Sequence, residues 1–164
     1  MSTPDSTDIP WLTPEQQDAW QTLVALVTRL PAALDTQLQR DSGLTHFEYF
    51  VLAALSEADE RRLRLSELAA HANASLSRLS HVVTRMEKRD WVRRDTVPGV
   101  RGAFAVLTDD GLTTVAEAAP GHVRTVQALV FAGLDATQVA QLSVLGDALI
   151  DQLDRGIAAG TGKA

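Results

Sequence analysis

Hydrogen-bond donors recur at helical spacing over residues 75–89, near the middle of the chain. In a helix, residues three, four and seven positions apart share a face. The donor face carries Arg78, His81, Arg85 and Lys88. The opposite face carries Leu76, Leu79, Val83 and Met86. Guanidinium groups bind guanine edges through paired hydrogen bonds and bind phosphates through charge. The segment therefore suits a helix that packs on a core and presents donors to nucleic acid.

A second short helix is predicted over residues 66–72, and the polar turn 73–75 joins it to the donor helix. Ser75 is a suitable N-cap for the latter. Two helices joined by a short turn form a helix-turn-helix, whose second helix lies in the major groove of DNA. The alternative interpretation is a solvated basic face on a helical hairpin.

Charge is unevenly distributed along the chain. Its 164 residues carry a net charge of -6, but residues 61–101 hold ten Lys and Arg against four Asp and Glu, a net of +6. The remaining residues are strongly acidic. Because phosphate binding depends on local charge, this basic segment favours a nucleic-acid partner despite the acidic average.

Composition restricts the other function classes. Hydrophobic residues make up 45% of the chain and cysteine is absent, which excludes disulfides, zinc–thiolate sites and thiol redox sensing. We find no apolar run long enough for a bilayer and no signal peptide at the N-terminus, and therefore predict a cytoplasmic protein with no membrane partner. Motifs for phosphate loops and nucleophile elbows are missing, so an enzyme is not expected.

Helices are predicted on both sides of Asp41-Ser42-Gly43. Residues 13–40 have a long apolar stripe, with Thr13 as N-cap and a bend expected at Pro31. Thr45 is the predicted cap of the second helix, in which Phe50 is expected to face a core. Residues 63–65 alternate like a short strand.

A basic β-hairpin is predicted after the donor helix. Residues 91–97 and 103–107 alternate in hydropathy around a Pro/Gly-rich turn, which is typical of two paired strands. A hairpin at this place is a wing. The next helix is expected to run from residue 109 to about residue 130, with a kink or a break at Pro120.

Long apolar stripes at the two ends of the chain predict an assembly. A small winged domain needs neither the first nor the last helix, so we expect both to form a two-fold homodimer. The alternative is that they extend one monomeric core. The expected organisation is a tail at 1–12, one domain at 13–157 with a winged lobe at about 45–108 and dimerisation helices at about 13–40 and 109–157, and a tail at 158–164.

The joint pattern resembles the MarR family of bacterial transcription regulators over about residues 13–157. The similar motifs are Leu65-Ser66-Glu67-Leu68-Ala69, Ser75-Leu76-Ser77-Arg78-Leu79, Val83-Thr84-Arg85-Met86-Glu87, Trp91-Val92-Arg93-Arg94 and Ala105-Val106-Leu107-Thr108-Asp109-Asp110-Gly111. The resemblance implies a homodimeric winged helix-turn-helix protein, mainly α with a small β-hairpin wing. It also implies binding of double-stranded DNA at a palindromic operator and release by a small aromatic or anionic effector.

The resemblance places particular residues on DNA. Those matching the recognition helix are Ser75, Ser77, Arg78, His81 and Arg85. Arg101 matches the wing-tip arginine of the minor groove, and Arg94 is a candidate phosphate contact. The chain departs from the family at Asp90, where glycine is usual, and at the wing loop 97–100, which lacks the acidic residues that commonly brace the wing arginine.

A ligand cavity in the family lies between the dimerisation helices and the DNA-binding lobe. Trp20, His46, Tyr49 and Phe50 are placed to line it, the alternative being that they are ordinary core or exposed residues.

The histidines lack metal-binding spacing, so we expect no metal and no cofactor. The favoured function is sequence-specific DNA binding by a ligand-responsive repressor; the alternative is a protein-interaction module with a winged-helix lobe.

Overall fold

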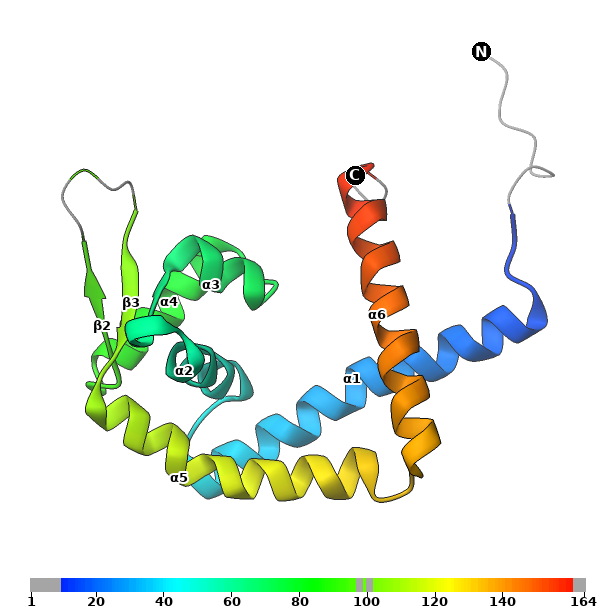
Figure 1. Ribbon diagram of the computed structural model, residues 1–164, viewed down its shortest axis with the longest axis horizontal. Helices are drawn as coiled ribbons and strands as arrows, with labels where there is room; N and C mark the ends of the chain where they lie inside the picture. Colours follow the sequence, from blue (N-terminus) through cyan, green and yellow to red (C-terminus); the bar gives the residue numbers. More distant parts are fainter. Residues whose placement is uncertain (1–9, 97–98, 100–101, 161–164) are drawn as a thin grey trace, which may run out of the picture. The chain divides into compact units, whose positions relative to one another are not determined.

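The computed structural model describes residues 10–96, 99 and 102–160. Its elements are α1 (Pro14–Ser42), α2 (His46–Glu57), a 3₁₀ turn (Asp59–Arg61), β1 (Arg62–Arg64), α3 (Leu65–His71), α4 (Leu76–Glu87), β2 (Val92–Asp95), β3 (Phe104–Leu107), α5 (Asp109–Val126), a π-helical turn (Gln127–Phe131) and α6 (Ala136–Ala158). Figure 1 shows these elements in chain order. The predicted winged helix-turn-helix fold is confirmed.

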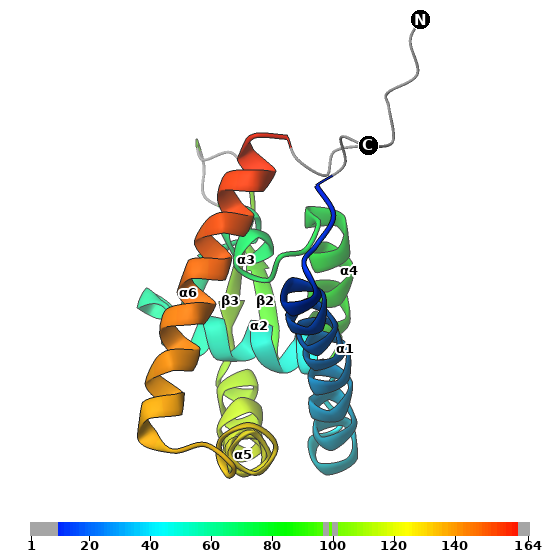
Figure 2. The ribbon, with the colours of Figure 1, turned by 90° about the vertical axis from the view of Figure 1, so that its right-hand side faces the viewer.

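The chain forms two compact units, the first ending at His122 and the second beginning at Val123. In the first unit, α2 contacts α1 and β3, while α4 contacts α3 and β2 (Figure 2). The strands form one antiparallel sheet in the order β1-β3-β2. The predicted hairpin is thus present, and β1 extends it to three strands.

Side-chain caps define where the helices begin. Thr13 and Thr45 each form a capping box, with Gln16 and Glu48 respectively, as the polar residue before each apolar stripe predicted. The Ser75 hydroxyl accepts a hydrogen bond from the Arg78 amide at 3.2 Å and caps α4. These satisfied amides fix the register in which each helix presents its side chains.

The core of the first unit joins α2, α3, α4 and the sheet. Its fully buried larger side chains are Leu38, Leu44, Val51, Leu52, Leu55, Leu68, Leu79, Val83 and Met86. Two predictions were wrong. Leu76 is 53% exposed, because the buried face of α4 begins one turn later and consists of Leu79, Val82, Val83 and Met86. Phe50 is 38% exposed rather than directed into the core.

Pro120 does not divide α5, because the helix continues to Val126 before the π-helical turn. Of the two predicted outcomes, the break is therefore absent. Pro120 is exposed, so water can satisfy the carbonyl that loses its amide partner. Likewise, α1 continues through Pro31.

The second unit presents apolar side chains to its surroundings. None of the residues of α6 is buried, although the structure describes the whole helix. Leu145, Leu149 and Leu153 are 63%, 54% and 59% exposed. Among the described residues, no single helix has the length and apolar composition of a bilayer span; only α5 and α6 together, as a bent pair, reach that composition.

Candidate nucleic-acid interface

The outward face of α4 carries most of the residues predicted to contact DNA. Ser77, Arg78, His81 and Arg85 are all exposed, and Ser75 is exposed at the cap. Asn73 occupies the turn before α4 with a φ of +45°, and the Ala74 amide donates to the Ala69 carbonyl at 2.9 Å. The turn therefore fixes α4 against α3 and leaves its donor face uncovered.

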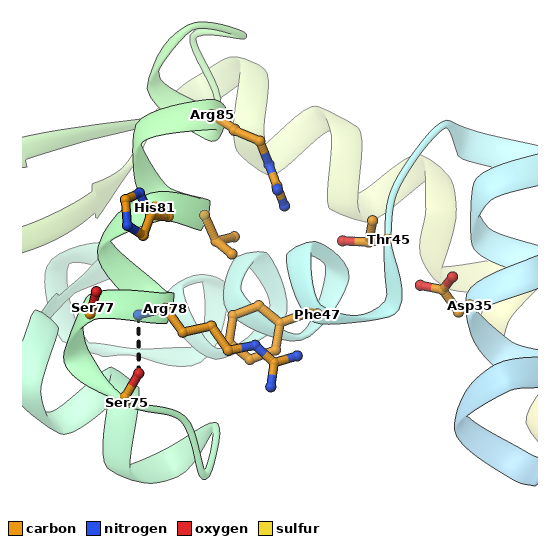
Figure 3. A pocket seen from close by; sticks show the side chains of 9 residues that line it. Asp35, Thr45, Phe47, Ser75, Ser77, Arg78, His81 and Arg85 are labelled. Atoms are coloured by element: carbon orange, nitrogen blue, oxygen red, sulfur yellow. Dashed lines mark hydrogen bonds between the residues drawn. The ribbon is translucent and has the colours of Figure 1, made fainter. Parts of the chain in front are cut away.

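A groove of about 610 Å³ runs along this face of α4 towards the start of α2 (Figure 3). It is lined by Asp35, Thr45, Phe47, Ser75, Ser77, Arg78, His81, Val82 and Arg85. Arginine, histidine and hydroxyl groups thus converge on one concave surface. Such a donor set binds phosphates and base edges.

Two residues of α2 contact the arginines of α4. The Arg78 guanidinium carbon lies 4.9 Å from the centre of the Phe47 ring, and Figure 3 shows the Arg78 side chain beside this ring. The Arg85 Nη2 atom donates to Glu48 Oε1 at 3.4 Å. Phe47 and Glu48 were not predicted from the sequence as part of this site, although Thr45 was predicted as the cap of their helix.

Arg94 lies in an internal network at the base of the wing. Its side chain is 28% exposed and pairs with Glu87. Its Nη2 atom also donates to the Ser80 carbonyl at 2.8 Å and to the Thr84 hydroxyl at 3.0 Å. Because these acceptors already engage the guanidinium, the geometry favours a bracing role over the predicted phosphate contact, which remains untested.

The turn from α4 into the wing passes through Asp90, which adopts a φ of +57°. This is the left-handed conformation that glycine adopts most easily. The departure from glycine at this position therefore leaves a left-handed turn in place. Arg101, the predicted minor-groove arginine, lies outside the described residues.

A small aromatic cluster lies where α2 begins and α5 passes it. The rings of Tyr49 and His122 are 4.3 Å apart between centres, and those of His46 and His122 are 6.0 Å apart. The buried Nδ1 atom of His122 has no hydrogen-bond partner among the described residues. His46 and Tyr49 were predicted from the sequence to line a ligand site, whereas His122 was not, since only the fold brings α5 to α2. Trp20, by contrast, is 54% exposed on α1.

Burial lowers the pKa of both histidines below its usual range. Asp35 partly opposes the lowering of the His46 pKa, and the neighbouring His46 further lowers the His122 pKa. The Asp35 carboxylate accepts a hydrogen bond from the His46 amide at 2.8 Å. Burial also raises the pKa of Tyr49, with Glu57 adding to it. Within the described ranges, no three His, Asp or Glu side chains form a metal-binding group.

Comparisons with known proteins agree on one family. A family model described as MarR family matches residues 44–99. The chain is similar to Sco3205, a MarR family transcriptional regulator from Streptomyces coelicolor solved in complex with DNA, with 44% identity over 89% of this chain and 92% of that chain and a TM-score of 0.84. It is similar to AbsC, another such regulator from Streptomyces coelicolor, with 37% identity over 89% and 99% of the two chains and a TM-score of 0.83. No curated protein sequence matches the chain.

Proposed function

The chain belongs to the MarR family of transcriptional regulators, and we propose that it binds a pseudo-palindromic operator as a homodimer and acts as a ligand-responsive repressor. Members of this family are transcription regulators rather than enzymes. The observation that carries the proposal is the exposed donor face of α4, where Arg78 and Arg85 flank the groove. The DNA complex of the related Sco3205 supports it.

In the proposed complex, α4 enters the major groove. Ser77, Arg78, His81 and Arg85 contact base edges or nearby phosphates, and Ser75 lies close to the backbone. Arg101 of the wing contacts the minor groove, where negative potential attracts arginine.

The proposed homodimer uses the helices at both ends of the chain. Residues 13–40 and 109–157 form its interface, while residues 45–108 form the DNA-binding lobe. The support is the uncovered apolar surface of α6 and of α1, on which Trp20 and Val27 are 54% and 57% exposed. An apolar surface of this extent is typical of an interface between subunits. Two-fold symmetry would place two copies of α4 on two half-sites.

The proposed effector site is the cluster of His46, Tyr49 and His122, to which we add Phe50, the residue that follows Tyr49 on α2. Aromatic walls with a few polar atoms suit a small aromatic anion. Benzoate titrated calorimetrically into the protein is the simplest probe. Weaker binding to a His122→Ala variant would support the site, whereas equal binding to both proteins would remove it.

DNA binding is tested by titrating random-sequence duplex into the protein at several salt concentrations. We expect an affinity that falls steeply with salt, because phosphate contacts release counterions. On a duplex selected by the wild-type protein, Arg78→Ala should cost about 1–3 kcal/mol and relax specificity at one half-site position. Arg40→Ala removes an equal charge outside the groove and serves as the control. Absence of salt-sensitive binding would favour the alternative of a protein-interaction module.

A further inference from the structure

The first turn of α2 contacts both arginines of the recognition helix. Phe47 lies 4.9 Å from the Arg78 guanidinium carbon, and Glu48 lies 3.4 Å from Arg85 Nη2. Arg78 and Arg85 are seven residues apart and therefore share one side of α4. Two consecutive residues of one helix thus each contact one arginine of another helix.

The Glu48 carboxylate is held in place by hydrogen bonds from Thr45, independently of Arg85. The residue is 5% exposed, and its Oε2 atom accepts hydrogen bonds from the Thr45 amide and hydroxyl, both at 2.9 Å. Its second oxygen, Oε1, is the atom that accepts from Arg85. The cap of α2 therefore holds a carboxylate at a defined place beside Arg85, which lines the groove.

Arg85 can still donate hydrogen bonds to DNA while it is paired with Glu48. Its side chain is 59% exposed, and only Nη2 meets Glu48. A guanidinium carries five N–H donors, so several remain for a base edge or a phosphate. A charge pair at one end of the planar group leaves the other end directed away from the carboxylate.

Phe47 acts on Arg78 through its ring face. The ring is half-buried and packs against the core, so its position is set by α2 rather than by the arginine. A cation held over an aromatic face keeps its N–H edge available for hydrogen bonds. This arrangement restricts an otherwise flexible side chain before DNA arrives.

The negative charge of Glu48 points to a role in the sequence specificity of DNA binding rather than in its overall affinity. A carboxylate beside the DNA face repels phosphates and so opposes binding to any sequence. A residue that only strengthened DNA binding would not be acidic. An acid that orients an arginine can instead favour one base over another, since bidentate contacts depend on geometry.

We propose that Phe47 and Glu48 are positioning residues that orient Arg78 and Arg85 for base recognition, so that the first turn of α2 helps to determine the operator sequence. The proposal rests on the proposed function, because it requires α4 to contact bases. In the competing explanation Glu48 only caps α2 and Phe47 only fills the core.

The first experiment compares specific with non-specific affinity. A duplex selected from a random library by the wild-type protein is the specific probe, and a scrambled duplex of equal length is the non-specific one. Glu48→Gln keeps a capping-box residue at N3 but removes the charge. We expect the ratio of the two affinities to fall about tenfold with Glu48→Gln and with Phe47→Leu, while binding to the scrambled duplex is kept or increases.

Two variants control this comparison. Phe47→Tyr retains the ring face and should retain the affinity ratio. Glu57→Gln neutralises an exposed carboxylate at the other end of α2 and should leave the ratio unchanged. Circular dichroism and thermal melting confirm that each variant is folded at the assay temperature.

A double-mutant cycle separates positioning from capping. If Glu48 acts through Arg85, then Glu48→Gln should have no further effect on the ratio in an Arg85→Ala background, and Phe47→Leu none in an Arg78→Ala background. Additive effects, or equal losses on both duplexes, would overturn the proposal. Failure of the wild-type protein to bind any duplex would instead overturn the proposed function, so the two failures are distinguishable.

Discussion

Arg94 on β2 and Glu87 on α4 form an ion pair that joins the wing to the recognition helix. The backbone amide of Arg94 also donates to Glu87, at 3.0 Å, so both the strand and the side chain are tied to this carboxylate. The Arg94 side chain reaches Ser80 and Thr84 on the same helix. Because the two side chains are only 28% and 29% exposed, removing one partner should cost more than breaking a surface ion pair, since the other is left unpaired and poorly solvated.

We therefore expect Arg94→Ala to destabilise the fold. Loss of the guanidinium leaves Glu87 and the Ser80 carbonyl without this partner, which should lower the free energy of unfolding by about 1–3 kcal/mol. Arg93→Ala is the matched control, because Arg93 precedes Arg94 on β2 and its side chain is exposed. Urea unfolding of both variants measures the difference. Equal stability of the two variants would show that Arg94 does not stabilise the packing of the wing on α4, and would favour the predicted phosphate contact instead.

Local signals were predicted well from the sequence, and long-range ones were not. The caps Thr13, Thr45 and Ser75 depend on residues three positions away and were identified correctly. The network of Arg94 depends on a residue seven positions away across a turn, which no periodicity reports. Leu76 was assigned to the core because its spacing allowed it, but the packing of α3 and the strands decides where the buried seam lies.

Gly111 makes a close contact at the start of α5. A Cβ atom there would lie 2.0 Å from the Trp91 carbonyl oxygen and 2.7 Å from Leu107 Cδ1. Gly111→Ala should therefore lower the free energy of unfolding by about 1–3 kcal/mol, since backbone and core must move. Gly133→Ala is the control, because a Cβ there meets nothing within 4 Å. Thermal denaturation that melted both variants alike would contradict the close packing.

The apolar stripe of α6 predicts a specific pattern of dimer disruption. Leu142, Leu145, Leu149 and Leu153 recur at spacings of three and four and share one side of the helix, whereas Val144 lies on the other side. Leu149→Glu should convert the dimer to a monomer at micromolar concentration, because a charge cannot be buried unpaired in an apolar interface. Val144→Glu should remain dimeric. Sedimentation velocity measures both; a wild-type monomer would remove the proposed dimer.

The fold also explains why other features could not be inferred from local sequence. β1 pairs with β3, whose residues lie some forty positions later, with Arg62 opposite Val106. The contact between His46 and His122 joins helices that are still further apart along the chain. Such pairings follow from the packing of α2 with its neighbours rather than from a pattern within one segment.

The histidine cluster predicts a pH dependence of stability. Burial lowers the pKa of His46 and His122, so the unfolded chain binds protons more readily than the folded chain around and below pH 6.5. The free energy of unfolding should therefore be retained above the unfolded pKa and fall as the pH drops through it. One proton contributes at most about 1.4 kcal/mol per pH unit, and partial exposure keeps the effect smaller.

His122→Gln should make this fall shallower between pH 7.5 and pH 5, because it removes one titrating ring and its repulsion of a protonated His46. His71→Gln, which removes an exposed histidine of α3, should keep the wild-type dependence. Urea unfolding at each pH provides the measurement. An identical pH dependence of the free energy of unfolding for wild type and His122→Gln would mean that His122 does not contribute to it. A steeper dependence in the variant would mean that protonated His122 stabilises the contact between α2 and α5.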